Sequence, residues 1–76
     1  MGTHRWRSLT TVTPGSAVEV REILGEGLRA FCHEIGINEG EVLRCRADGA
    51  THKIMVTASG RTIVIEQDYA RFINVS

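Results

Sequence analysis

The sequence predicts a mainly β fold, a small and partly open barrel of about five strands with one short α-helix and a helical turn before the last strand. A chain of 76 residues has room for one domain and one small core. Val, Ile and Thr each occur seven times, against four Leu, and such β-branched side chains suit a pleated surface. Period-two alternation recurs along the chain, whereas only one long segment has the helical period.

The first residues set the start of the domain. Residues 1–8 show no periodicity, so we expect a flexible arm there and a single domain over 9–76. Residues 13–16 read Thr-Pro-Gly-Ser, which is typical of a turn because Pro fixes φ and Gly tolerates positive φ. The apolar–polar alternation over 18–24 then predicts the first strand.

One segment has the spacing of a helix. Its apolar residues fall at i, i+3, i+4 and i+7, at positions Leu28, Phe31, Cys32 and Ile35. Gly36 suits the left-handed position after the helix, and Ile37 is the apolar residue expected to pack back on it. A helix of two to three turns is not stable alone, so it must dock on the sheet with this stripe, Phe31 included, buried.

The rest of the chain returns to strand patterns. Strands are predicted over 41–47, 53–57, 61–65 and 72–75, with a helical turn over 66–70. Arg44 and Arg46 share one phase of the first of these strands and are expected to face solvent. Five short strands with one helix between them suit a partly open barrel, which also reduces the length of exposed strand edge.

Several motifs resemble the FeoA family. The run over 13–20, Thr-Pro-Gly-Ser-Ala-Val-Glu-Val, resembles the opening of that family, and the run over 35–40, Ile-Gly-Ile-Asn-Glu-Gly, resembles its hallmark of an apolar residue, Gly, an apolar residue and a second Gly. The end of the chain is similar too, with Gly60 in a hairpin before the run Ile-Val-Ile over 63–65. The resemblance covers residues 9–75.

The chain also departs from the family pattern at three places. Cys32-His33 stands where the family usually carries two consecutive Leu. Glu39 stands where a Pro commonly precedes the second Gly, and Thr51-His52-Lys53 replaces the family's Asp-Pro pair.

The resemblance implies an SH3-like barrel, the fold found also in the C-terminal domain of DtxR-like repressors. It further implies a small cytoplasmic accessory protein of bacterial ferrous iron transport, which acts by binding the cytoplasmic, GTP-binding part of a FeoB-type transporter. Such a protein is not an enzyme, and the only cofactors that come into question are Fe²⁺ and Zn²⁺. The resemblance leaves the oligomeric state open.

Composition restricts the partners. Nine basic and nine acidic residues give zero net charge, which argues against nucleic acid because phosphate binding needs a basic face. No apolar run reaches membrane length, so membrane insertion is not expected. Two cysteines without a framework predict reduced thiols in the cytoplasm.

The alternative function is a sensor module that binds Fe²⁺ or Zn²⁺ directly. Its candidate ligands are His33, His52 and Cys45, with His4 and Cys32 as the remaining His and Cys donors. None of these has the spacing of a structural zinc site, so only the tertiary fold could bring them together.

Two further groups of residues bear on function. His33, Arg44 and Arg46 are the candidates for contacts with a protein partner. Cys32 and His33 are neighbours on a helix and point about 100° apart, so they do not form a catalytic pair, and Cys32 is expected to be a core residue.

Overall fold

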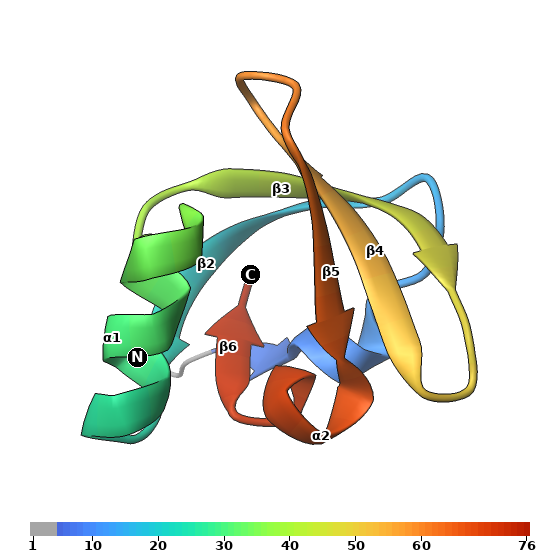
Figure 1. The fold of residues 1–76 in the computed structure, drawn as a ribbon. Coiled ribbons are helices and arrows are strands. Elements are labelled where there is room, and N and C mark those ends of the chain that lie inside the picture. The colour runs from blue at the N-terminus through green and yellow to red at the C-terminus, as the bar shows by residue number, and fades with distance from the viewer. Residues whose placement is uncertain (1–4) are drawn as a thin grey trace.

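The computed structural model describes residues 5–76 (Figure 1). Its elements are, in chain order, β1 (Arg7–Ser8), the 3₁₀ turn η1 (Leu9–Thr11), β2 (Ala17–Ile23), α1 (Glu26–Ile35), β3 (Val42–Asp48), β4 (His52–Thr57), β5 (Thr62–Glu66), the short helix α2 (Gln67–Ala70) and β6 (Ile73–Val75). The predicted strands, helix and helical turn are all present within about two residues of their expected bounds.

The strands of this part of the chain form one antiparallel sheet in the order β1-β6-β2-β3-β4-β5. Its two edge strands, β1 and β5, do not pair with each other, so the sheet curls without closing (Figure 1). The prediction of a mainly β, partly open barrel is confirmed, with six strands over residues 5–76 in place of about five.

The extra strand corrects the predicted boundary of the N-terminal arm. Arg7 and Ser8 were expected in the arm over 1–8, but they pair with Val75 and Asn74 of β6. Leu9, which follows directly, is fully buried and holds this segment against the core. The domain therefore includes residues 7 and 8, and residues 1–4 of the predicted arm lie outside the described part.

Alternation along the strands builds the core. Strand β3 buries Leu43 and Cys45 while Arg44 and Arg46 face solvent, as predicted. The buried apolar side chains form a single cluster, composed of Leu9, Val12, Val18, Val20, Ile23, Cys32, Ile37, Leu43, Cys45, Met55, Ile63, Ile65, Ala70, Ile73 and Val75. Fifteen residues make a small core, so each contributes a large share of the stability.

The end of α1 has the predicted geometry. Gly36 adopts a left-handed conformation with φ of 97°, and its N–H donates to the carbonyls of Cys32 and His33. The N–H of Ile37 donates to the Cys32 carbonyl at 2.7 Å, and the Ile37 side chain is fully buried. Arg61, from the β4–β5 hairpin, donates from Nη2 to the carbonyl of Ile35 at 2.9 Å. The end of the helix is therefore fixed to the distant hairpin.

A lysine lies in the interior, which the sequence did not lead us to expect. Lys53 is the only lysine of the chain and has no exposed side-chain surface. Its Nζ donates to the Val12 carbonyl at 2.6 Å and to Asp48 Oδ1 at 2.9 Å. The amide of Gln67 donates to the same carboxylate oxygen at 2.7 Å. Lys53 therefore joins the turn before β2, the β3–β4 corner and α2.

Replacing this lysine should destabilise the fold. Lys53→Met leaves the buried Val12 carbonyl without its donor, which costs about 1–3 kcal/mol of unfolding free energy. Chemical unfolding followed by circular dichroism measures this loss. Arg46→Met, on an exposed β3 position, is the control and should change stability by no more than about 0.5 kcal/mol. Equal unfolding midpoints for the two variants would contradict the role given to Lys53.

The same network makes stability depend on pH. The hydrogen bond from Lys53, followed by that from Gln67, lowers the pKa of Asp48 below its ordinary value of 3.8. Ionised Asp48 therefore stabilises the fold above about pH 4, and this contribution is lost as the pH falls through the lowered pKa. Urea midpoints measured between about pH 5 and pH 2.5 should fall more steeply for the wild type than for Asp48→Asn. If the urea midpoints of the two proteins fall equally with pH, the Asp48 interaction does not contribute to the free energy of unfolding.

Candidate functional site

The residues predicted as metal ligands occupy separate parts of the fold. His33, on α1, has its Nε2 2.8 Å from Oε1 of Glu39. His52 begins β4, and its Nδ1 lies 2.8 Å from the Thr51 hydroxyl. Cys45 is buried in β3 with its thiol directed at a backbone carbonyl. His4 lies outside the described residues.

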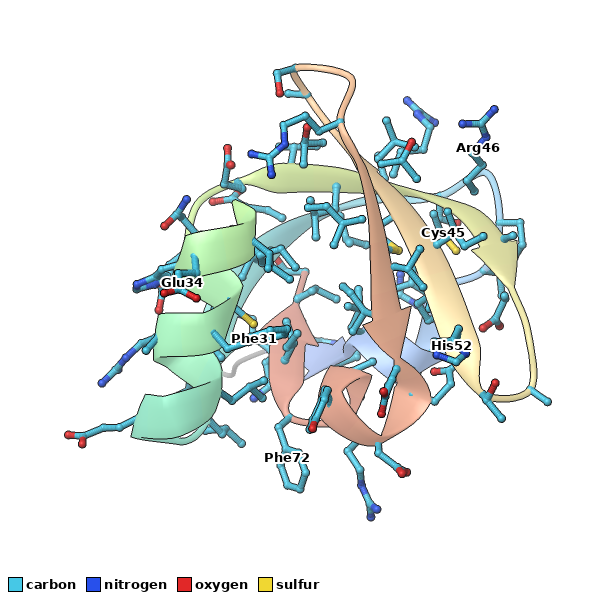
Figure 2. The ribbon with its side chains drawn as sticks, viewed as in Figure 1. Phe31, Glu34, Cys45, Arg46, His52 and Phe72 are labelled. Atoms are coloured by element: carbon cyan, nitrogen blue, oxygen red, sulfur yellow. The ribbon has the colours of Figure 1, made fainter. Side chains whose placement is uncertain are left out.

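The structure therefore does not bring the metal candidates together. Over residues 5–76, no group of three or more His, Cys, Asp or Glu side chains could hold a metal ion. Figure 2 shows Cys45 and His52 at the β3–β4 side of the sheet, away from α1.

The thiol next to His33 is a core residue, as predicted. Cys32 is buried beneath α1. Burial first, and then the nearby Glu39 carboxylate, raise the pKa of the Cys32 thiol from 9.0 to about 11. A thiol that stays protonated is a poor nucleophile, so Cys32 is unsuited to covalent catalysis.

The predicted partner contacts do not share one surface. Arg44 and Arg46 are exposed on the outer face of β3, and Arg44 donates from Nη1 to the Gly15 carbonyl at 3.0 Å. His33 lies on α1 and is engaged with Glu39. Figure 2 places Arg46 on the far side of the sheet from α1. Any interface would include only some of these three residues.

A different surface stands out instead. Phe31 was expected to be buried by its place in the helical stripe, but it is 48% exposed. Its ring lies beside that of Tyr69 on α2, with centroids 6.2 Å apart and planes at 54°. We call the exposed apolar area around this pair the aromatic surface, formed by Leu24, Leu28, Phe31, Tyr69 and Phe72.

The aromatic surface is continuous along α1 and α2. A shallow hollow of about 330 Å³ is lined by Gly27, Leu28, Phe31 and Tyr69. A wider hollow of about 500 Å³ shares Leu28 and Tyr69 with it and extends to Phe72. Clustered exposed apolar side chains of this kind mark interaction sites, and buried aromatic anchors dominate many interfaces.

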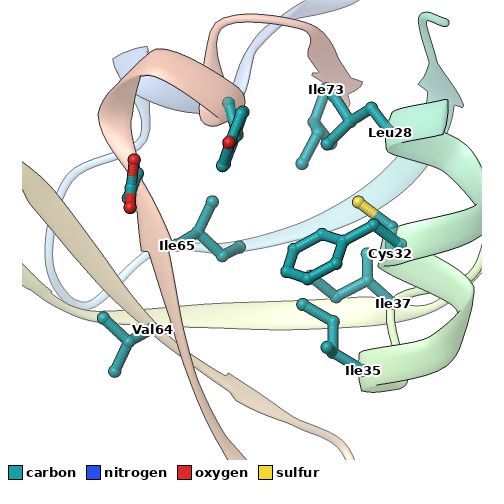
Figure 3. A pocket seen from close by; sticks show the side chains of 10 residues that line it. Leu28, Cys32, Ile35, Ile37, Val64, Ile65 and Ile73 are labelled. Carbon is teal, nitrogen blue, oxygen red and sulfur yellow. The ribbon is translucent and has the colours of Figure 1, made fainter.

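A narrower notch opens beside this surface, between α1 and β5. It has a volume of about 90 Å³, and its lining residues are apolar except for Glu66 and the hydroxyl-bearing Tyr69. Figure 3 shows Leu28, Cys32, Ile35 and Ile37 on the α1 side, facing Ile65 of β5 across the opening, while Val64 points away from α1 at its outer edge. Phe31 and Tyr69 also line it, so the notch and the aromatic surface are contiguous. The arrangement can accept apolar side chains, and the Cys32 thiol that lines it stays protonated.

One local signal for this site is the shortness of the helix that carries Tyr69. Of the four residues of α2, only Ala70 is buried. A helix of four residues can place only one face against the core. Tyr69 therefore lies at the edge of that face, and Phe72, which follows the helix, lies largely outside the core. The exposure of Phe31 has no such local signal, because it depends on how α1 rotates against the sheet.

Comparison with known proteins finds a matching family model and several similar structures. The model of the FeoA domain matches residues 7–76. The crystal structure of an iron uptake regulatory protein (FeoA) superposes with a TM-score of 0.83 at 21% identity, over 92% of this chain and 95% of that one. An FeoA-like protein from Clostridium acetobutylicum gives a TM-score of 0.84 at 19% identity, over 97% and 88%.

The fold also occurs inside larger proteins. A manganese-dependent transcriptional repressor, in complex with manganese, gives a TM-score of 0.89 at 24% identity, over 99% of this chain but 38% of the repressor. Together with the FeoA structures, this likeness confirms the expected SH3-like barrel. No curated protein gives a significant match. Neither helix of the described chain is long and apolar enough to cross a bilayer.

The protonated, buried state of Cys32 leads to a test. At pH 8, a pKa of about 11 leaves about one Cys32 thiol in a thousand ionised. Iodoacetamide should therefore alkylate Cys32 slowly in the folded protein and rapidly in concentrated urea, as followed by peptide mass spectrometry. Fast stoichiometric alkylation without denaturant would contradict the core assignment and make a reactive thiol credible.

Proposed function

The chain belongs to the FeoA family, and we propose that it serves ferrous iron transport as a cytoplasmic accessory protein that binds the GTP-binding domain of a FeoB-type transporter. Family membership supplies the link to iron transport. The aromatic surface is the observation that supports the mode of action, since exposed aromatic side chains on a small domain favour docking onto another protein.

The docking energy comes from apolar burial. Phe31, Tyr69 and Phe72 each leave close to half of their surface exposed, so a partner can remove a large apolar area from water at about 25 cal/mol per Å². The Phe31 and Tyr69 rings already contact each other, which reduces the freedom they lose on binding. By binding one state of the transporter domain more tightly than another, the protein would shift that domain's equilibrium without any chemistry of its own.

The metal-sensing alternative has less support. Its candidate ligands His33, His52 and Cys45 lie on three elements, and two of them are already hydrogen-bonded to neighbouring side chains. A site for Fe²⁺ or Zn²⁺ would need ligands from a second molecule to complete it. Calorimetric titration of the protein with either ion, alone and in the presence of the transporter domain, separates the two functions.

The interface can be tested by truncating its aromatic residues. Phe31→Ala and Tyr69→Ala should each weaken binding to the purified GTP-binding domain by at least about tenfold, or about 1.4 kcal/mol. Isothermal titration calorimetry with the full chain measures the affinity. Thermal melts confirm that each variant is folded.

The chain offers a matched control on its opposite side. Val42 is an exposed apolar residue of β3 with the same 48% exposure as Phe31, but it lies outside the aromatic surface. Val42→Ala should leave the affinity within about twofold of the wild type. Loss of binding with Val42→Ala, or with Arg44→Ala and Arg46→Ala alone, would move the interface to the β3 face. Absence of binding by the wild type would overturn the proposed function.

A further inference from the structure

We propose that the partner docks through an extended, positively charged segment, which pairs with the free edge of β5 and inserts an apolar side chain into the notch. This inference rests on the proposed function for the identity of the partner. Its own basis is three features that meet at β5: an unpaired strand edge, an apolar notch beside it, and a border of carboxylates without ion-pair partners.

The first feature is the backbone of β5. This strand ends the sheet and pairs only with β4, on one side. The Thr57 N–H donates to the Arg61 carbonyl at 2.9 Å, which fixes the alternation of the ladder. In this register Ile63 and Ile65 hydrogen-bond to β4, so the N–H and C=O groups of Thr62 and Val64 point outward. An added strand would satisfy them.

The second feature is the position of the notch. Val64, the most exposed large apolar side chain in the described chain at 57%, lines it together with Ile65. Side chains of a strand paired with β5 alternate between the two faces of the sheet. Those on the inner face would enter the notch, whose volume of about 90 Å³ has room for one aliphatic side chain. Those on the outer face would lie beside Val64 and Glu66.

The third feature is the charge around the site. Four carboxylates on the elements that carry the notch and the aromatic surface (α1, β5 and α2) have no basic group within ion-pair distance in residues 5–76, namely Glu26, Glu34, Glu66 and Asp68. Glu66 itself lines the notch. Glu34 lies three residues after Phe31, so both lie on adjoining sides of α1 (Figure 2).

Three arginines on or beside the same elements do not cancel this charge. Arg29 lies on α1, three residues after Glu26. Arg61 donates to the Ile35 carbonyl, and Arg71 lies over the Phe72 ring, 5.5 Å from its centroid. Four carboxylates against three guanidinium groups leave one net negative charge around the rim of the site, in a protein of zero net charge. Basic side chains flanking an apolar residue in the partner would complement this rim and direct it to β5.

A pair of synthetic peptides tests the inference on the full chain. The probe is acetyl-Gly-Arg-Val-Leu-Val-Arg-Gly-amide, and its control carries Glu in place of both Arg. In a titration of the ¹⁵N-labelled protein, the probe should shift the amides of Thr62 and Val64 and those facing the notch. The control peptide should bind about tenfold more weakly, because it brings like charges to the rim.

Two variants separate strand pairing from simple apolar contact. Val64→Pro removes only an outward N–H, which β4 does not use, so the fold should persist while peptide binding is lost. Val64→Thr keeps the N–H and the branched shape, and it should bind within about threefold of the wild type. Glu66→Lys should reverse the preference between the two peptides, and no side-chain hydrogen bond of Glu66 is lost by this change.

The outcomes are distinct from those of the proposed function. Equal binding of both peptides, shifts confined to the outer face of β3, or no shift at millimolar peptide would overturn this inference, and so would Val64→Pro binding like Val64→Thr. If the transporter domain binds while the probe does not, the proposed function stands without this mode of docking. If the probe binds while the transporter domain does not, the β5 edge takes a basic segment of another partner.

Discussion

The rest of the structure depends on one constraint, which is that the sheet does not close. Strands β1 and β5 end the sheet without pairing, so the interior would be open along one side. Helix α1 covers part of that side with Leu28, Cys32 and Ile35, and the Gly36 and Arg61 contacts hold its end in place. What α1 leaves uncovered is the notch. The same opening that limits the core therefore creates the candidate site.

The sequence predicted most elements because their signals are local. Alternation over β2 and β3, and the Gly36–Ile37 pair after α1, depend on neighbours within a few residues. Strand β1 has no such signal, since two residues become a strand only when β6 lies alongside them. Lys53 was missed for a related reason, because its buried acceptor Val12 lies 41 residues away in the chain. Contacts between residues so far apart in the chain produce no periodic pattern in the sequence.

The site was harder to predict than the fold. The sequence-based hypotheses named histidine, cysteine and arginine residues because these side chains have recognisable chemistry. In the fold, however, His33, His52 and Arg46 lie on different elements. The aromatic surface consists of ordinary apolar residues whose only distinction is that they are half exposed. Exposure is a property of the packed molecule, so Phe31 and Tyr69 could be recognised as a pair only once α1 and α2 had been placed together.

The burial of Lys53 has a consequence for chemical modification. Because the sequence contains no other lysine, the folded domain presents no lysine ammonium group to an acylating enzyme or reagent. Its Nζ becomes accessible only when the β3–β4 corner separates from the turn that precedes β2. Acylation of Lys53 would therefore show that the domain had opened. The acyl group would also replace the buried cation with a neutral amide, which would hinder the domain from folding back.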